Sequence, residues 1–360
     1  MLLDHLRFLV SCDTRNPPRA IRGTDTLFSY LKVQLESAGC RVTVRDLGDG
    51  AVSLLALRGT PSVLVNIHLD TVPDNPRWTR DPLTLHVEDD RAYGLGACDI
   101  KGGAAALVAA AQQTSGDVAI LFSTDEEYGH SLCIHDFLAE RPEGLEALSF
   151  VVVSEPTNCR AVLAHRGFAR GKVMTRGEAG HSSEPRGLVD NANHKLGLWL
   201  AAAVAHAQEL EQVSALGLNG VRFNCGVLEG GRADNVIAAE ASALFSVRPP
   251  PGISPEELVQ ALGALCDNSS EVLFTGPPLP ARDAEKQASV ARERAAELGL
   301  ELAEPVGFWT EAALFSAAGL PTFVFGPGGI SEAHIADEWV LLEELERARQ
   351  VFMKVLGGRR

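Results

Sequence analysis

Two polar residues two positions apart, His68 and Asp70, follow a mostly apolar, β-branched run at 63–67. Residues i and i+2 of an extended strand point to the same side, so the spacing predicts an imidazole and a carboxylate together at a strand end. Ligands of open α/β sheets bind outside the carboxyl ends of the strands. The pair is therefore a candidate for metal binding, with a hydrogen-bonded pair at a turn as the alternative.

Further acidic residues stand at comparable points of the chain. Glu126 and Glu127 follow a buried-type strand at 117–123, Glu155 follows another at 148–153, and Asp99 lies in a glycine-rich loop before a helix. At one edge of a parallel sheet these groups would share a pocket, and like charges a few Å apart in a low dielectric cannot all ionise. Divalent metal ions would remove that conflict.

Strands and helices alternate along most of the chain, which predicts an α/β fold with a mostly parallel sheet and helices on both faces. The periodicity predicts helices at 25–38, 104–113, 283–298, 311–318 and 338–356, and strands at 41–45, 51–57, 117–123, 148–153 and 321–325. The polar rim after the last of these strands supplies another imidazole, His334.

The pattern changes between 164 and 278. Strands predicted at 168–175, 221–227 and 236–247 surround a long apolar-striped helix at 191–211. A length of 360 residues fits about two domains. We therefore expect residues 1–163 and 279–360 to form one domain, interrupted by an inserted α+β domain at 164–278.

Composition limits the possible partners and location. The chain has 32 Lys and Arg against 47 Asp and Glu, a net charge of −15, which disfavours binding to nucleic acid or anionic membranes. Seven scattered cysteines without a C-x-x-C pair are typical of a reducing compartment. Without a secretory signal pattern or an apolar run of about 18 residues, the sequence predicts a cytoplasmic protein.

Five motifs occur in order along the chain: His68-x-Asp70, Gly-x-x-Asp99-x-Lys-Gly, Glu126-Glu127, Ser-Glu155-Pro-Thr, and His334 after Gly-Pro-Gly. In this they resemble the co-catalytic zinc metallopeptidase and amidase family, which includes acetylornithine deacetylase, succinyl-diaminopimelate desuccinylase, aminoacylase and glutamate carboxypeptidase. The resemblance spans nearly the whole chain. Its compact length and Ser-Glu-Pro-Thr motif are most similar to the acetylornithine deacetylase branch, and within it to acetylcitrulline deacetylases.

The resemblance implies a zinc exopeptidase-like fold that holds two Zn²⁺ ions per subunit, with Co²⁺ as a substitute. Asp99 would bridge the ions, with His68 and Glu155 as the other ligands of one and Glu127 and His334 as those of the second. Mixed imidazole and carboxylate ligation suits these metals and leaves open positions for a water.

The same resemblance implies catalytic roles. Glu126 would be the general base, and the Asp70 carboxylate would orient His68 and fix its tautomer. Residues 1–163 and 279–360 would form the catalytic metal-binding domain, and 164–278 a lid and dimerisation domain.

The inserted domain would contribute to catalysis and substrate binding. By resemblance, His181 would hold the oxyanion in its own or the partner's site, Arg248 would clamp the substrate α-carboxylate, and Asn235 would bind substrate. In the catalytic domain, glycines 326, 328 and 329 would leave backbone N–H groups free to meet a small anion.

The implied reaction is deacetylation of a small N-acyl amino acid to the free amino acid and acetate in arginine biosynthesis, by a homodimer. N-acetyl-L-citrulline is the first candidate substrate and N-acetyl-L-ornithine the second. Glu311 where the family pattern has Asp, and Ala238 where proline commonly follows Asn-Val-Ile, leave the substrate open. The alternatives are a di- or carboxypeptidase or another N-acyl amidase and, in a different class, an inactive metal-binding scaffold.

Overall fold

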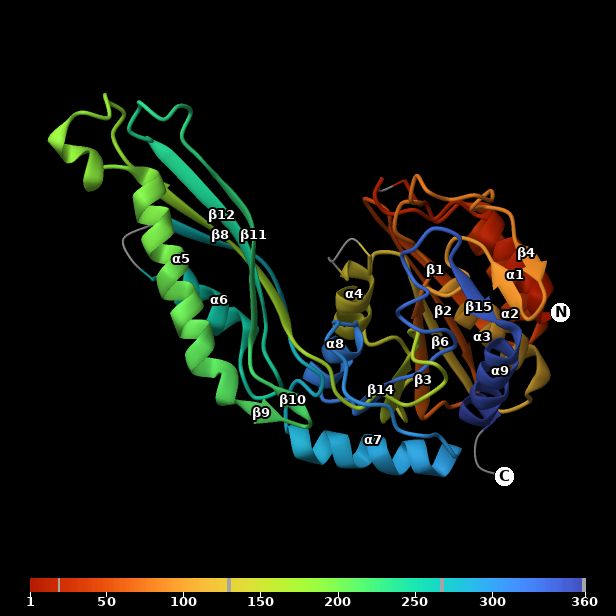
Figure 1. Ribbon diagram of the computed structural model, residues 1–360. Helices are drawn as coiled ribbons and strands as arrows, with labels where there is room; N and C mark the ends of the chain where they lie inside the picture. Colours follow the sequence, from red (N-terminus) through yellow and green to blue (C-terminus); the bar gives the residue numbers. More distant parts are fainter. Residues whose placement is uncertain (19, 128–130, 266–268, 358–360) are drawn as a thin grey trace. The chain divides into compact units, whose positions relative to one another are not determined.

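The computed structural model describes residues 1–18, 20–127, 131–265 and 269–357, and the chain divides into two compact units (Figure 1). The first unit comprises Met1–Leu163, Lys286–Ala303 and Thr310–Arg360, and the second Ala164–Glu285 and Glu304–Trp309. The short return at 304–309 belongs to the second unit because its backbone pairs there: Val306 N donates to Ala164 O at 3.1 Å.

The first unit is built on a six-stranded sheet in the order β1-β2-β6-β3-β7-β14. Strands β6, β3, β7 and β14 run parallel, whereas β1 and β2 pair antiparallel at one edge. Every residue of β3 and β6 is buried, as expected for parallel strands covered on both faces. The strands are β1 (Arg41–Gly48), β2 (Ala51–Arg58), β3 (Val63–His68), β6 (Val118–Ser123), β7 (Phe150–Val153) and β14 (Thr322–Val324).

Helices cover both faces of this sheet (Figure 1). One face carries α1 (Leu2–Ser11), α2 (Thr26–Ser37), α3 (Lys101–Gln113) and α9 (Leu342–Gly357), and the other carries α4 (Leu132–Glu140) and α8 (Ala312–Ala317). Helix α3 is buried over most of its length, because its alanines and glycines let α1, α9 and the sheet approach closely. The predicted α/β fold with a mostly parallel sheet is confirmed.

One predicted element is wrong in part. The helix expected at 338–356 begins only at Leu342, and the residues before it form β15 (Trp339–Leu341). This strand pairs antiparallel with β5 (Arg91–Tyr93), which also pairs with β4 (His86–Glu88). Val340 is fully buried between two half-buried neighbours, as expected for a strand. In so short an apolar run, the sequence pattern alone does not separate a strand from the start of a helix.

The second unit is a four-stranded antiparallel sheet in the order β11-β12-β8-β13, packed against helices α5 and α6. Trp199 of α5 is fully buried, and its indole N–H donates to Leu262 O of α6 at 2.8 Å. The elements are β8 (Phe168–Arg176), α5 (Ala192–Glu209), β11 (Arg222–Gly230), β12 (Glu240–Arg248), α6 (Pro255–Gly263) and β13 (Ser269–Gly276), with a small hairpin of β9 (Ser214–Ala215) and β10 (Leu218–Asn219).

Two further helical segments of the second unit are short 3₁₀ turns, η1 (Pro185–Leu188) and η2 (Leu210–Gln212). Helix α7 (Ala284–Leu298) leads back into the first unit, where it buries Ala291 and Ala295 in the core. Among the helices that the structure describes, none is both long and apolar enough to cross a membrane.

Candidate metal centre

The carboxyl ends of three parallel strands bring polar residues to one edge of the sheet. His68 is the last residue of β3 and pairs with Ser123 at the end of β6, so Glu126 and Glu127 follow close by. Asn66 of β3 pairs with Val153 of β7, two residues before Glu155. The register of the sheet therefore places these side chains at the same level.

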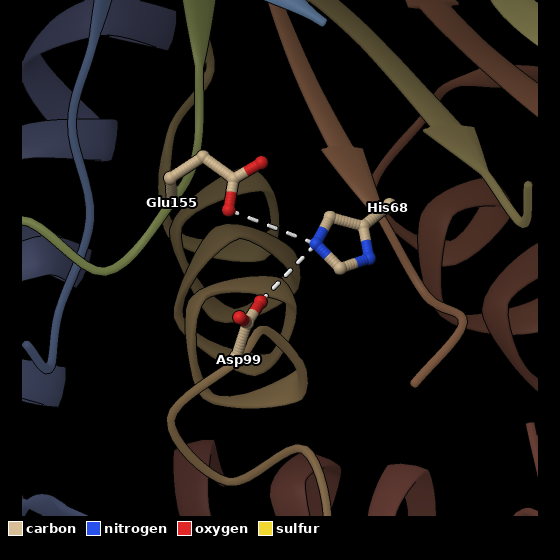
Figure 2. A group of neighbouring side chains, drawn as sticks. All are labelled: His68, Asp99 and Glu155. Carbon is tan, nitrogen blue, oxygen red and sulfur yellow. Dashed lines mark ion pairs between the residues drawn. The ribbon is translucent and has the colours of Figure 1, made fainter. Parts of the chain in front are cut away.

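His68 and Glu155 form a buried cluster with Asp99, which lies in the loop before α3 (Figure 2). We call this cluster the first triad. His68 Nε2 lies 3.2 Å from Asp99 Oδ1 and 3.7 Å from Glu155 Oε2. The side chains are 2%, 8% and 8% exposed, respectively. The first triad is therefore a buried group of imidazole and carboxylate atoms that could ligate a metal ion.

The hydrogen bonds of His68 determine which nitrogen faces the triad. Its Nδ1 lies 3.0 Å from the backbone carbonyl of Asp70, and because a carbonyl only accepts, Nδ1 carries the hydrogen. Nε2 then presents its lone pair to two carboxylates, an arrangement that requires a proton or a metal ion between them. Burial disfavours the imidazolium, but the carboxylates of Glu155, Asp70 and Asp99 outweigh it and raise the pKa of His68 well above its usual value.

A second triad comprises Asp99, Glu127 and His334. His334 Nε2 lies 3.3 Å from Asp99 Oδ2 and 3.0 Å from Glu127 Oε1. Hydrogen bonds to Asp99 and Glu127 raise the pKa of His334 to about 11. His334 is 47% exposed and has a left-handed backbone with φ of 58°, a conformation that non-glycine residues adopt rarely and often at functional sites.

Asp99 belongs to both triads, and each of its oxygens faces a different one. Within each triad the ligand atoms all lie within 4.8 Å of one another. Among the described residues no hydrogen bond reaches the buried Oδ1, although His68 lies close. A carboxylate with one oxygen directed at each of two donor sets is suited to bridge two divalent cations, so the residues fit a dinuclear metal group.

Glu126 and Asp70 adjoin the triads. Burial, followed by the negative charge of Glu155, raises the pKa of Glu126 well above its usual value, as suits a proton acceptor. The Asp70 carboxylate lies 3.4 Å from His68 Nδ1, further away than its own backbone carbonyl. Its Oδ2 accepts a hydrogen bond from Glu127 N at 3.0 Å, so Asp70 positions a member of each triad.

The predicted lid residues lie at two ends of the second unit. The loop of His181 pairs with Val236, beside Asn235, and Ser182 N donates to Asn235 O at 3.1 Å. This pairing is why β12 begins at Glu240 and not at the predicted 236. His181 is exposed, with Nδ1 2.8 Å from Ser183 Oγ.

Arg248 ends β12, at the opposite end of the strand from Asn235. Its guanidinium lies 4.3 Å from the centre of the Phe168 ring, and burial lowers the pKa of Arg248. Nη1 also lies 3.4 Å from Gly307 O. A strand of nine residues spans roughly 25–30 Å, so Arg248 and Asn235 of one chain lie too far apart to contact the same small molecule.

The prediction that the glycine-rich loop after β14 leaves its backbone N–H groups free is wrong for Gly326 and Gly328. Gly326 N donates to Thr157 Oγ1 at 3.0 Å, and Gly328 N donates to Glu344 Oε2 at 2.9 Å. These N–H groups are therefore not free for an anion. Gly328 has a φ of 77°, and a Cβ there would come within 2.4 Å of Cys98 Sγ, so glycine is needed for this loop to pack beside Asp99.

The structure adds two buried carboxylates that the sequence analysis did not assign to the centre. Glu311 accepts a hydrogen bond from Ser123 Oγ at 3.0 Å, and burial raises the pKa of Glu311 to about 8. Glu338 accepts hydrogen bonds from the backbone of the Asp99 loop. Nothing in the sequence distinguishes Glu338 from the adjacent Asp337 as a neighbour of this centre.

Comparison with known proteins agrees with this geometry. A family model described as peptidase family M20/M25/M40 matches residues 64–357. The chain is 46% identical to an N-acetyl-L-citrulline deacetylase of Xanthomonas campestris pv. campestris, over 99% of this chain and 97% of that protein. It is 31% identical to an acetylornithine deacetylase of Myxococcus xanthus, over 98% of this chain and 96% of that protein.

A solved structure shares the fold. The aminopeptidase PepT from Bacillus cereus superposes with a TM-score of 0.77 at 18% sequence identity, covering 99% of this chain and 97% of that one. The family resemblance predicted from the five motifs is confirmed by the family model and by the two relatives.

Proposed function

Because the chain belongs to peptidase family M20/M25/M40, we propose that it is a metal-dependent hydrolase that deacetylates an N-acetyl-L-amino acid. N-acetyl-L-citrulline is the first candidate substrate and N-acetyl-L-ornithine the second, which would place the reaction in arginine biosynthesis. The observation that carries the proposal is Asp99, whose two oxygens face two separate sets of imidazole and carboxylate donors.

Two Zn²⁺ ions, or Co²⁺ in their place, are the proposed cofactors. His68 and Glu155 would hold one and Glu127 and His334 the other, with Asp99 between them. Such ions, when bound, polarise an amide carbonyl and lower the pKa of a water to about 7.

Glu126 is the proposed general base. It removes a proton from the attacking water, whose oxygen bonds to the acetyl carbon, and delivers the proton to the nitrogen as the C–N bond breaks. The products are acetate and a free amino group. The raised pKa of this half-buried carboxyl group supports the role, because the group must both accept and release a proton.

The second unit is the proposed lid. His181 would stabilise the developing oxyanion, Asn235 would bind the substrate and Arg248 would clamp its α-carboxylate. Since Asn235 and Arg248 lie at opposite ends of β12, we propose that each substrate meets residues of two subunits.

A homodimer formed through this unit is supported by its exposed apolar residues. Strand β11 is one of the two edge strands of its sheet and exposes Val227 and Leu228, and α5 exposes Leu198 and Val204. An unpaired edge strand can pair with the same strand of a second copy about a two-fold axis. A cytoplasmic location remains a proposal that rests on the scattered cysteines.

The proposal is tested by acetate release from N-acetyl-L-citrulline and N-acetyl-L-ornithine, beside cleavage of a dipeptide, by protein loaded with two equivalents of Zn²⁺. We expect one acetylated amino acid to give the highest kcat/KM. A dipeptide preferred by orders of magnitude would instead favour a peptidase. Two bound metals with no hydrolysis of any amide would favour the inactive scaffold, against which the presence of Glu126 argues.

A further inference from the structure

A buried carboxylate lies behind the bridging position. Glu338 is 1% exposed and directly precedes β15, four residues after His334. Its Oε1 accepts hydrogen bonds from Cys98 N and Asp99 N, each at 2.8 Å, and its Oε2 accepts one from Gly96 N at 3.1 Å. One side chain thus engages three backbone N–H groups of the loop that carries Asp99.

These bonds are strong and specific. Hydrogen bonds from neutral donors to a carboxylate are roughly twice as strong as those between neutral groups, and burial removes competing water. The Asp99 N–H itself is one of the donors, so the backbone of this residue is held by a contact separate from those of its side chain with the triads. The main chain adds a further link, because Gly94 N donates to Glu338 O at 3.1 Å.

The position of Glu338 along the chain connects the two triads. His334 belongs to the second triad, and the segment from His334 to Glu338 runs from that triad to the loop of the shared ligand Asp99. Displacement of this segment would therefore move His334 of the second triad and, at the same time, release the loop that carries Asp99. Both carboxylate oxygens of Glu338 are engaged by backbone N–H groups, so its effect on the centre acts through the Asp99 loop.

We propose that Glu338 is a positioning residue that holds Asp99 where each of its oxygens faces one metal position. The inference rests on the proposed function, in which Asp99 bridges two metal ions. It predicts that Glu338 contributes to metal affinity. Partners that orient a metal ligand typically contribute 10–100-fold to metal affinity.

The neighbouring residue provides a matched control. Asp337 also anchors a loop, accepting hydrogen bonds from Thr79 N at 3.0 Å, Thr79 Oγ1 at 2.6 Å and Arg80 N at 3.3 Å. That loop carries none of the predicted ligands. D337N and E338Q therefore make the same chemical change in adjacent residues, and only the second touches the Asp99 loop.

The experiment compares metal-free wild type, D337N and E338Q in competition with a chromophoric chelator for Zn²⁺ and in visible absorption titrations with Co²⁺. In E338Q the new side-chain amide nitrogen would face the Gly96 N–H, donor against donor, so that hydrogen bond is lost. We expect E338Q to bind metal about 10–100-fold more weakly with an altered Co²⁺ spectrum, and D337N to stay within about twofold of wild type. Equal affinities and spectra for the two variants would overturn the proposal.

A second variant covers a failure of E338Q to fold, which circular dichroism of the metal-free protein would reveal. E338D keeps the charge but is one methylene shorter, so it cannot reach all three N–H groups and should weaken metal binding similarly. Wild-type affinity in E338D would then overturn the proposal. Failure of wild type to bind two metals would contradict the proposed function itself, a result distinct from equal binding by the variants.

Discussion

The two triads share Asp99 but differ in how the chain supplies their other ligands. The first triad takes His68 from the end of the buried strand β3 and Glu155 from the segment directly after the neighbouring strand β7, and its side chains are at most 8% exposed. The second takes His334 from a loop with a left-handed backbone, and this side chain is 47% exposed. The first position is thus anchored by a residue of a buried strand, and the second is completed by a half-exposed loop residue.

This difference teaches which position should hold its metal more tightly. Ligands on strands are placed more precisely than ligands on loops, and exposed loop segments open at lower free energy than core strands. We therefore expect the first position to fill first and to exchange more slowly. Four predictions test this expectation, beginning with the residue that the two positions share.

Replacing Asp99, which the two positions share, should weaken metal binding at both and so remove the difference in affinity between them. In D99N a neutral amide presents only one oxygen, so it cannot serve as an anionic bridge between the two positions. We expect both metal affinities to fall by more than about 100-fold and turnover to become undetectable. Isothermal titration calorimetry with Zn²⁺ measures this, and a variant that binds two ions with wild-type affinity would show that Asp99 is not shared.

Replacing the proposed general base, Glu126, should leave the metal affinities of both positions unchanged while kcat falls. E126Q removes the proton acceptor but none of the proposed ligands, so we expect kcat to fall by about 10²–10⁴-fold with unchanged binding of both ions. Parallel measurements of rate and metal content separate the two effects. Wild-type turnover by E126Q would remove this residue from the mechanism.

Substitutions of residues that belong to only one triad should change the metal affinity of one position more than that of the other. We expect H334A to retain one Zn²⁺ ion with an affinity within about tenfold of wild type, because the first triad is intact. H68A disrupts the buried triad and should weaken the tighter of the two sites. Loss of both ions from H334A alone would mean that the positions do not fill independently.

The pH dependence of metal binding gives the smallest effect. Contacts with Asp99 and Glu127 raise the pKa of His334 to about 11, so this imidazole is protonated at pH 7 without metal and must lose the proton to bind one. Metal affinity at the second position should therefore rise by about tenfold per pH unit between about pH 6 and 8. Calorimetry in buffers of different ionisation enthalpy would detect the released proton, and a pH-independent affinity would contradict the shift.

The sequence predicted which strand-end side chains come together, because their signal is local. Each acid or imidazole follows a buried apolar run, and the carboxyl ends of parallel strands meet at one edge. The fold class followed from the same alternation of strands and helices. The same strand-then-polar-rim pattern indicated His334, but its pairing with Glu127 came only from the family resemblance, since the two residues lie 207 positions apart in the chain.

Other features had no signal in the sequence. The partners of Glu338 are backbone N–H groups, which nearly any residue type provides, so no pattern of side chains indicates them. The N–H groups of Gly326 and Gly328 were expected to be free, but each is bonded to a side chain elsewhere in the sequence. By contrast, the separation of Asn235 from Arg248 follows from the strand that the sequence predicts between them at 236–247.

The most direct test of two metal positions that share Asp99 is a titration of metal-free protein with Zn²⁺ while acetate release from N-acetyl-L-citrulline is followed. With no metal we predict no measurable hydrolysis, and between zero and two equivalents the rate should rise to a maximum that further metal does not increase. Full activity in the metal-free protein would contradict the account.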